Sequence, residues 1–493
     1  MHRLTALVSS LALLAGLFVY APQSVRAVDP VYIGPGDGSG ECSTPDYITD
    51  GSTDDLQFNS AVTFMEGDID NIIFVCPGTY DIENWIVVGG PLTIEGVSGA
   101  ERTILDGTHN TQRIIGFLDA AKVIGLTFQN ADSDWEGAAI YAGSALTVRD
   151  SIFLNNHSGV EGAAIDFSGD GETIVTGSTF IGNSAVRGGA INDDWSLDFV
   201  ADSFFSDNSA DRGGALHVTR DVYEIHRSEF SENRAVAGYG GAIFADDDLD
   251  LIKDSLFLRN SATQGGGAVF VDDDFYDLNG NGAAGLVSNV FEGNQGLDGG
   301  AIQIDDEFVG VITRNTFLNN VGDDGGAIDF DGWVDGTISN NKFVGNYGTG
   351  DGGAIDADDI LSSTVITQNT FIGNTSEDDG GAMWLDDAIG AGSELAIISA
   401  NTFRDNHATG DGGAIHLNWM DSTTMPRGVS RNTFRSNRSG GVGGAISIIG
   451  LSSCVPEVTT RDAVRALGKN RFALNQATGS RRTANVGAVP CID

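Results

Sequence analysis

Residues 325–346 read GGAIDFDGWVDGTISNNKFVGN, and variants of this stretch recur along most of the 493-residue chain. Each variant opens with Gly-Gly-Ala-Ile or a close relative, and each closes with a Phe that is followed three residues later by an Asn. Successive glycine motifs lie 25 to 33 residues apart, a spacing that is typical of a solenoid. The motifs begin at Gly137, Gly162, Gly188, Gly213, Gly240, Gly266, Gly299, Gly325, Gly352, Gly380, Gly412 and Gly443.

The residues after each glycine pair alternate between apolar and polar side chains, as in Ile302-Gln303-Ile304-Asp305. A period of two indicates a β-strand with one buried face. A second strand ends on the Phe of the motif, as in residues 311–317, and Gly, Asp and Asn residues separate the strands. Two or three strands per coil predict an all-β protein, a parallel β-helix of about 12–14 coils.

Two positions of the repeat are expected to stack from coil to coil. The Phe side chains would lie about 4.8 Å apart and fill the narrow core. The Asn side chains would form a ladder of amides that satisfies backbone groups at the turn. A second ladder, two residues before the Phe, changes from Ser to Asn at Asn289. We interpret both ladders as structural rather than catalytic.

The ends of the chain differ from the repeat. A positive start, a short apolar segment and a small-residue cleavage site predict a secretory signal peptide, with a retained membrane anchor as the alternative. A short amphipathic helix is expected at residues 56–65, as part of an N-terminal cap. We therefore expect four segments: a signal peptide (1–27), an N-terminal cap region (28–75), the β-helix (76–476) and a C-terminal tail or cap (477–493).

The four cysteines fit a chain that is exported. Export permits disulfides, and four cysteines allow three pairings. Cys42–Cys76 and Cys454–Cys491 is the favoured pairing, because each pair flanks one end of the repeat array, where a solenoid needs capping.

The charge balance limits the partners. The formal net charge of −43 comes from 69 acidic and 26 basic residues, which argues against a nucleic acid or an anionic membrane surface as partner. No run after the signal is apolar enough to span a bilayer. Two interpretations of the acidity stay open: solubility in a normal or saline habitat, and cation binding.

The alternation of Gly-Gly-Ala-Ile-like motifs and Phe-x-x-Asn over residues 128–475 resembles the repeats of the chlamydial polymorphic outer-membrane protein family. This resemblance implies a surface-exposed β-helical passenger with adhesin-like roles. Proteins of that family also carry a C-terminal membrane barrel, and no series of alternating barrel strands follows Asn475 in this sequence.

Short motifs near the N-terminus carry a second, wider resemblance. The order of Pro77-Gly78-Thr79-Tyr80 and Thr103-Ile104-Leu105-Asp106-Gly107 resembles the start of the pectin-lyase-like β-helix superfamily. That resemblance implies a right-handed parallel β-helix.

One strand face of the repeat carries candidate binding residues. In the row directly after the Ile of each glycine motif, rings would point outward, where they can stack on sugars. The candidates for binding a polysaccharide or a cell-surface partner are Tyr141, Phe244, Phe270, Trp384 and His416. Ordinary surface variation, or packing under a loop, is the alternative.

The next outward row contains six successive aspartates, from Asp246 to Asp386. Stacked at about 4.8 Å, each neighbouring pair would repel by roughly 1 kcal/mol in water, so cations, salt, raised pKa values or splaying should offset the repulsion. The densest group, Asp329, Asp331, Asp356 and Asp358, is a candidate Ca²⁺ site, because Ca²⁺ prefers oxygen ligands. A solvated acidic face is the alternative.

A second candidate Ca²⁺ site lies in an insertion within one coil. Asp277-x-Asn279-x-Asn281-Gly282 matches the first half of a calcium-loop pattern. The match is partial, because Ser288 stands where the pattern has a bidentate Glu. An Asn/Gly-rich turn is the alternative.

These features favour a secreted or cell-surface, monomeric β-helix that binds a glycan or a surface partner in an adhesin-like way, with Ca²⁺ as a candidate cofactor. The alternative is a polysaccharide lyase, glycoside hydrolase or epimerase on the same fold, for which paired carboxylates are the usual acid and base. A purely structural spacer is a third hypothesis. The sequence shows no Ser/His/Asp grouping better than chance, so no catalytic residue is assigned.

Overall fold

A computed structural model describes most of the chain from Val31 onward. The described residues are 31–34, 42, 45–49, 54–65, 71–276, 284–361, 363–386, 396–418, 428–449, 469–478 and 486–488. The predicted signal peptide, Cys454, Cys491 and the candidate loop residues Asp277, Asn279 and Asn281 lie outside these ranges.

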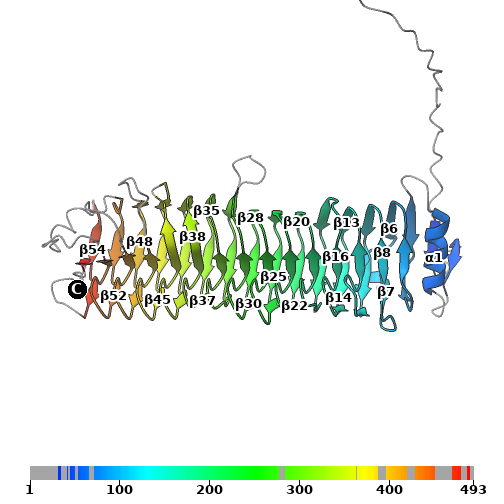
Figure 1. Ribbon diagram of the computed structural model, residues 1–493, viewed down its shortest axis with the longest axis horizontal. Helices are drawn as coiled ribbons and strands as arrows, with labels where there is room; N and C mark the ends of the chain where they lie inside the picture. The colour runs from blue at the N-terminus through cyan, green and yellow to red at the C-terminus, as the bar shows by residue number, and fades with distance from the viewer. Residues whose placement is uncertain are drawn as a thin grey trace, which may run out of the picture.

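The chain forms a right-handed parallel β-helix, as predicted, with three 15-stranded sheets that run the length of a rod (Figure 1). From β3 to β48, successive coils contribute one strand to each sheet, and these strands pair in parallel with their equivalents in neighbouring coils. The three sheets enclose one continuous hydrophobic core.

Sheet I lines the core with one stacked aliphatic side chain per coil. Val148, Val175 and Val200 pair in register, and the stack continues through Ile225 and Ile252. Its strands, in order, are β2 (Tyr47–Ile48), β1 (Val31–Gly34), β3 (Ile72–Val75), β6 (Leu92–Gly96), β9 (Ala121–Ile124), β13 (Leu146–Arg149), β17 (Thr173–Thr176), β20 (Leu197–Ala201), β24 (Val222–His226), β28 (Leu249–Lys253), β32 (Gly285–Val287), β35 (Val311–Thr313), β39 (Thr337–Ser339), β43 (Val365–Thr367) and β47 (Ile397–Ser399).

Sheet II carries the Phe stack. From Phe128 to Phe472 the ring centroids of successive coils lie 4.6 to 5.2 Å apart, and the rings are parallel within 11°. The prediction of a Phe ladder is therefore confirmed. Its strands are β4 (Gly78–Asp81), β7 (Thr103–Asp106), β10 (Thr127–Gln129), β14 (Ile152–Leu154), β18 (Thr179–Ile181), β21 (Phe204–Ser206), β25 (Glu229–Ser231), β29 (Leu256–Leu258), β33 (Val290–Glu292), β36 (Thr316–Leu318), β40 (Lys342–Val344), β44 (Thr370–Ile372), β48 (Thr402–Arg404), β51 (Thr433–Arg435) and β54 (Arg471–Ala473).

Amide ladders hold the two turns that flank sheet II. Asn320 Nδ2 donates to Asn346 Oδ1 and to the carbonyl oxygen of Phe291, each at 3.0 Å. The second ladder behaves alike, since Asn315 Nδ2 donates to Asn341 Oδ1 at 3.2 Å. Both predicted ladders are present, and they pair backbone groups that the corners would otherwise bury without partners.

Sheet III contains the strands that follow the glycine pairs. Gly325 takes a φ of 56°, and a side chain on Gly326 would meet the carbonyl oxygen of Gly353 in the next coil at 2.5 Å. The glycines thus permit a sharp corner and close approach of coils. The strands are β5 (Ile86–Val88), β8 (Ile115–Phe117), β12 (Ile140–Ala142), β16 (Ile165–Phe167), β19 (Ile191–Asp193), β23 (Leu216–Val218), β27 (Ile243–Ala245), β31 (Val269–Val271), β34 (Ile302–Ile304), β38 (Ile328–Val334), β42 (Ile355–Ile360), β46 (Met383–Leu385), β50 (Ile415–Asn418), β53 (Ile446–Ile449) and β56 (Val486–Ala488).

Short pairings between sheets II and III complete the coils. They form sheets of two, three and six strands. Their members are β11 (Asp132–Ser133), β15 (His157–Ser158), β22 (Ser209–Ala210), β26 (Arg234–Ala235), β30 (Ser261–Ala262), β37 (Val321–Gly322), β41 (Tyr347–Gly348), β45 (Thr375–Ser376), β49 (His407–Ala408), β52 (Arg438–Ser439) and β55 (Gln476–Ala477), and one 3₁₀ turn, η2 (Ala100–Arg102), precedes β7.

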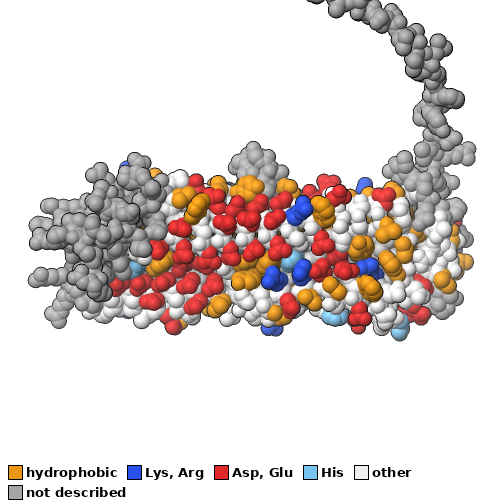
Figure 2. Space-filling model, in the orientation of Figure 1, with side chains coloured by type: hydrophobic (Ala, Val, Ile, Leu, Met, Phe, Trp, Pro, Cys, Tyr) orange, Lys and Arg blue, Asp and Glu red, His pale blue; other side chains and the backbone are white. Residues whose placement is uncertain are grey.

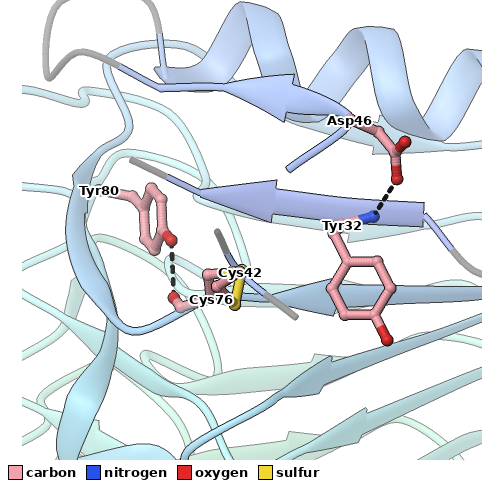
Figure 3. The surroundings of a disulfide bond; sticks show 5 residues. All are labelled: Tyr32, Cys42, Asp46, Cys76 and Tyr80. Atoms are coloured by element: carbon pink, nitrogen blue, oxygen red, sulfur yellow. Dashed lines mark hydrogen bonds between the residues drawn. A yellow bond between two sulfur atoms is a disulfide. The ribbon is translucent and has the colours of Figure 1, made fainter. Parts of the chain in front are cut away.

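The N-terminal end of the rod carries a helix and a disulfide, as the sequence predicts. Helix α1 (Asp54–Met65) lies at one end of the rod, and Phe58 packs edge-on against Tyr80 with ring centroids 5.4 Å apart (Figure 1). The predicted disulfide between Cys42 and Cys76 is present beside Tyr80, whose hydroxyl donates to the carbonyl oxygen of Cys76 at 2.6 Å (Figure 3).

The β-helix extends further than residues 76–476. Strands β1 and β3 already belong to sheet I, and β56 pairs with β53 in sheet III. The division of the chain into four segments stays a prediction. No helix in the described part of the chain combines the length and apolar character that crossing a bilayer requires.

Candidate functional site

Sheet III presents a face made of three columns of side chains. From β12 to β53 the central column, the second residue of each strand, is Tyr141, Asp166, Asn192, His217, Phe244, Phe270, Gln303, Asp329, Asp356, Trp384, His416 and Ser447. The turn column, directly before each glycine motif, is Glu136, Glu161, Arg187, Arg212, Tyr239, Gly265, Asp298, Asp324, Asp351, Asp379, Asp411 and Val442. The distal column is Asp194, Thr219, Asp246, Asp272, Asp305, Asp331, Asp358, Asp386 and Asn418.

Most of the central column is buried, which corrects the expectation that its aromatic rings are exposed. Phe244 and Phe270 are each 1% exposed, and His416 is 2% exposed. The turn column covers them, since the Tyr239 ring lies 4.3 Å from that of Phe270 and the Arg212 guanidinium lies 5.5 Å from that of Phe244. These rings therefore offer no open platform, whereas Tyr141 and Trp384 are partly exposed.

Where the central column holds an amide, the amide donates to flanking carboxylates. Asn192 Nδ2 donates to Asp166 Oδ1 and to Asp194 Oδ1, each at 3.0 Å. Gln303 Nε2 donates to Asp305 Oδ1 and Asp331 Oδ2, each at 2.8 Å. An amide in this position thus offsets part of the acidity around it.

Asp329 and Asp356 occupy the two positions after Gln303 and pair in register on β38 and β42. They are 3% and 4% exposed. Asp329 Oδ2 and Asp356 Oδ1 are fully buried and have no hydrogen-bond partner among the described residues. Burial of a carboxylate without a partner is costly, so these two oxygens need neutralisation.

The turn column adds carboxylates beside this pair. Ligand oxygens of Asp298, Asp323 and Asp324 lie within 4.8 Å of one another, and so do those of Asp351, Asp378 and Asp379. Figure 2 shows Asp and Glu side chains gathered over the region of β38, toward the C-terminal part of the rod. Either triplet could hold a metal ion by its chemistry.

The turn-column aspartates also support the coils. Asp324 Oδ1 accepts the backbone N–H of Asp351 at 3.1 Å, and Asp351 Oδ1 accepts the N–H of Asp379 at 2.7 Å. Each carboxylate therefore caps the next coil with one oxygen.

Burial is the first cause of the raised pKa values on this face. It raises the pKa of Asp329 and of Asp356 well above 3.8, and neighbouring carboxylates raise them further. The pKa of Asp351 rises to about 7, and those of Asp298, Asp358 and Asp379 rise to about 6, with the same first cause. The face thus takes up protons more readily than isolated aspartates.

A third acidic triplet, Asp248, Asp273 and Asp274, lies at the other end of these strands, just before the insertion at 277–283. Burial raises the pKa of Asp248 to about 6. The calcium-loop hypothesis for Asp277, Asn279 and Asn281 stays a prediction, because those residues lie outside the described ranges.

An aromatic hollow lies near the N-terminal end of the same face. Trp85, Gln112, Arg113 and Trp135 line a volume of about 230 Å³. The Arg113 guanidinium lies 4.4 Å from the Tyr141 ring and 5.3 Å from the Trp85 ring. Arg113 Nη2 donates to Glu136 Oε2 at 2.7 Å, which fixes its orientation. Trp135 is 59% exposed.

The sequence named Tyr141, whose ring contacts Arg113 of this hollow, as a candidate binding residue, but it missed the lining residues Trp85, Arg113 and Trp135. The available signal was Gly116, which replaces a side chain in the central column of β8. A Cβ on Gly116 would lie 2.6 Å from Trp85 Nε1, so only glycine leaves room for the indole. The missing side chain at Gly116 was therefore the signal for the placement of Trp85.

His416, Ser447 and Asp379 meet in space but do not form a catalytic triad. Ser447 Oγ lies 2.9 Å and Asp379 Oδ2 lies 3.2 Å from the same ring nitrogen, His416 Nδ1. A triad needs the serine and the carboxylate on opposite nitrogens. Ser447 is also fully buried, and burial lowers the pKa of His416 to about 4, so we interpret His416 as a neutral imidazole with a structural role.

The structure divides the five predicted binding residues into three groups. Phe244 and Phe270 stack with centroids 5.0 Å apart, and Trp384 lies 6.3 Å from His416. Tyr141 belongs to neither pair and lies beside Arg113 of the aromatic hollow. Nine coils separate Tyr141 from Trp384, which is roughly 43 Å along the rod.

Comparison with known proteins agrees with the repeat resemblance. Residues 227–246 and 402–418 match the Chlamydia polymorphic membrane protein repeat. No curated protein matches the chain.

Solved structures similar to the chain are β-helix proteins. A PL6 family polysaccharide lyase from Pseudopedobacter saltans has 12% sequence identity and a TM-score of 0.35, with 87% of this chain and 92% of that chain covered. The tailspike protein of an E. coli bacteriophage, in complex with a pentasaccharide, has 12% identity and a TM-score of 0.30, with 92% and 80% covered. A surface adhesin of Streptococcus pneumoniae has 12% identity and a TM-score of 0.24, with 91% and 92% covered.

Proposed function

We propose that this protein is a secreted or cell-surface binding module that recognises a glycan through the face of sheet III. The observation that supports this proposal is the aromatic hollow of Trp85, Gln112, Arg113 and Trp135. The match to a membrane-protein repeat family supports a location at the cell surface.

The hollow combines the two kinds of group that a sugar ring uses. Exposed indole gives an apolar face for the C–H side of the ring, and Gln112 and Arg113 give hydrogen-bond donors for its hydroxyls. The hollow is smaller than pockets that enclose a drug-sized ligand, so it suits one residue of a longer chain.

The rest of the face suggests which glycan is favoured. Acidic side chains accept hydrogen bonds from hydroxyl groups and repel anionic groups. Because the chain carries a net charge of −43, we expect a neutral glycan rather than a uronate polymer. A polysaccharide-active enzyme is the competing function, and the same experiment separates the two.

The test is size-exclusion chromatography of neutral and acidic polysaccharides incubated with the protein. A neutral polymer that co-elutes intact supports the proposal. A polymer that becomes shorter overturns it in favour of an enzyme, and no interaction across the panel favours a protein partner or a structural role.

Two tryptophan variants locate the binding site. Trp135→Ala should weaken binding of the retained polymer about tenfold, because it removes an exposed stacking surface. Trp333→Ala is the matched control, since Trp333 is 56% exposed but lies on β38, far from the hollow. Equal effects of the two substitutions would move the site away from the hollow.

A further inference from the structure

The central column contains three buried aspartates, at Asp166, Asp329 and Asp356, and only the last two have an oxygen without a partner. Asp166 belongs to a coil with the same acidic spacing, because Glu161 stands five residues before it as Asp324 stands before Asp329. We therefore compare two cases. Both oxygens of Asp166 have hydrogen-bond partners in the protein, whereas Asp329 and Asp356 each have one oxygen without a partner among the described residues.

In the Asp166 coil the protein itself supplies every partner. Asn192 Nδ2 donates to Asp166 Oδ1 at 3.0 Å, and Ser168 Oγ donates to Asp166 Oδ2 at 2.8 Å. The turn-column residue is neutralised as well, since Arg187 Nη1 lies 3.0 Å from Glu161 Oε1. This coil needs no cation.

In the Asp329 and Asp356 coils the donors are replaced by acceptors. Asp298, Asp324, Asp331 and Asp356 are the charged groups that face Asp329, and all are carboxylates. Asp324, Asp351 and Asp358 face Asp356. No arginine, lysine or histidine is among the groups that act most strongly on either carboxyl group.

We propose that sheet III binds two divalent cations of the calcium type in successive coils. One is held by Asp298, Asp323 and Asp324 together with Asp329, whose charged neighbours include Asp298 and Asp324. The other is held by Asp351, Asp378 and Asp379 together with Asp356, whose charged neighbours include Asp351. The buried, unpartnered oxygens of Asp329 and Asp356 supply the observation that the acidic triplets alone lack.

The chemistry of the ligands favours Ca²⁺ among common divalent ions. Ca²⁺ accepts six to eight oxygen ligands in irregular arrangements, whereas Mg²⁺ requires a near-octahedral shell and keeps several waters. Each group here offers carboxylates from two neighbouring coils, so a bound ion would link the coils. Asp358, a charged neighbour of Asp356 on the distal side, is available as an additional ligand.

These ligands differ from the set that the sequence suggested. The sequence pattern combined Asp329 and Asp356 with Asp331 and Asp358 on the distal column. Asp331 Oδ2 already accepts a hydrogen bond from Gln303 Nε2 at 2.8 Å. The turn column instead provides the oxygens that lie within 4.8 Å of one another.

The test is Ca²⁺ titration calorimetry on the protein after removal of metal with EDTA, at pH 7.5. The wild type should bind two Ca²⁺ with dissociation constants in the range of about 10⁻⁶–10⁻³ M. Asp329→Asn and Asp356→Asn should each remove one of the two equivalents, and the double variant should remove both.

Asp166→Asn is the matched control, because it alters a buried central-column aspartate whose partners the protein provides. It should bind two Ca²⁺ like the wild type. Wild-type protein that binds no Ca²⁺, or variants at 329 and 356 that keep both equivalents, would overturn the proposal.

Thermal unfolding gives a readout that does not depend on calorimetric stoichiometry. Ca²⁺ should raise the unfolding midpoint of the wild type and of Asp166→Asn, because a ligand that binds only the folded state stabilises it. The midpoint of the double variant should not respond. An equal rise in all three proteins would mean nonspecific screening and would contradict the two sites.

Discussion

At the scale of single residues, each coil of the repeat contains three residues with positive φ, and at the two that flank the sheet II strand the sequence does not always place glycine. Ala400 has a φ of 58° and is exposed, and Gly373 has a φ of 63° with no atom within 4 Å of where a Cβ would stand. An L side chain in this conformation costs roughly 1 kcal/mol or more. The two positions therefore isolate backbone strain from packing.

We expect Ala400→Gly to raise and Gly373→Ala to lower the free energy of unfolding, each by about 0.5–1 kcal/mol. Neither substitution removes a side chain from the core or a backbone hydrogen bond. Urea denaturation measures both. Opposite signs are required, and a loss of stability in Ala400→Gly would show that the methyl group makes a stabilising contact.

Asp166 gives a pH-dependent prediction at the same scale. Burial raises the pKa of Asp166 from 3.8 to about 7, so the folded protein holds a proton that the unfolded chain has released. Its contribution to stability is therefore greatest below about pH 4, declines as the pH rises through the folded pKa, and is constant above it.

Asp166→Asn should remove this decline. Its side-chain oxygen can still accept from Asn192, and its amide can donate to the Ser168 hydroxyl. Relative to the wild type, the variant should gain on the order of 2–4 kcal/mol at pH 8.5 and nothing at pH 4. Unfolding free energies at the two pH values test this, and a gain that is the same at both would assign the effect to packing.

At the scale of elements, the amide ladders are the main polar support of the coils. Asn320 Oδ1 accepts from the backbone N–H and from Nδ2 of Asn294, at 2.9 and 3.0 Å, while Asn320 Nδ2 donates to Asn346 and Phe291. Removal of this amide leaves buried donors and acceptors unpaired on both neighbouring coils. Such groups cost about 1–3 kcal/mol each.

Asn320→Ala should therefore lower the free energy of unfolding by about 3–5 kcal/mol. Lys342→Ala, an exposed substitution on β40 in the following coil, should change it by no more than about 0.5 kcal/mol. Thermal and urea unfolding monitored by circular dichroism would measure both. If Asn320→Ala lowers the free energy of unfolding by less than an ordinary surface hydrogen bond contributes, then water takes the place of the amide.

The geometry of the strands explains which features the sequence could predict and which it could not. Alternation in Ile302-Gln303-Ile304 correctly identifies which side chains face the core, because strand geometry alone determines it. The alternation does not show whether the side chains that point away from the core are exposed to water. Phe270 points away from the core yet is 1% exposed, because Tyr239 from the preceding coil's turn covers it.

Contacts between the central and turn columns of sheet III depend on the geometry of the turns, and the two-residue alternation of the strands does not determine that geometry. The sequence identified Asp329 and Asp356 but not their neighbours in the turn column. It also missed Trp85, whose space depends on Gly116 in a coil without the full repeat motif. Ladders were predictable because the same residue type recurs in every coil, whereas the candidate sites arise where the repeat is broken.

At the scale of the whole molecule, charge is distributed unevenly along a rod. The chain carries 69 acidic and 26 basic residues, and Figure 2 shows acidic side chains concentrated toward the C-terminal part of the face drawn there. Neighbouring coils are about 4.8 Å apart, well inside the Debye length of about 10 Å at 0.1 M salt. Carboxylates on adjacent coils therefore repel one another in dilute buffer.

Monovalent salt should consequently stabilise the fold, in contrast to proteins held by surface ion pairs. With EDTA present to exclude divalent ions, we expect the unfolding midpoint at pH 8 to rise by several degrees between 0.02 and 1 M NaCl, as the Debye length falls from roughly 20 to 3 Å. The rise should be smaller at pH 5, where carboxyls whose pKa burial raises to about 6, such as Asp298 and Asp379, already hold protons in the folded state. Differential scanning calorimetry at the two pH values measures both slopes. An equal response at pH 5 and pH 8 would assign the effect to a general action of salt on apolar burial rather than to carboxylate repulsion.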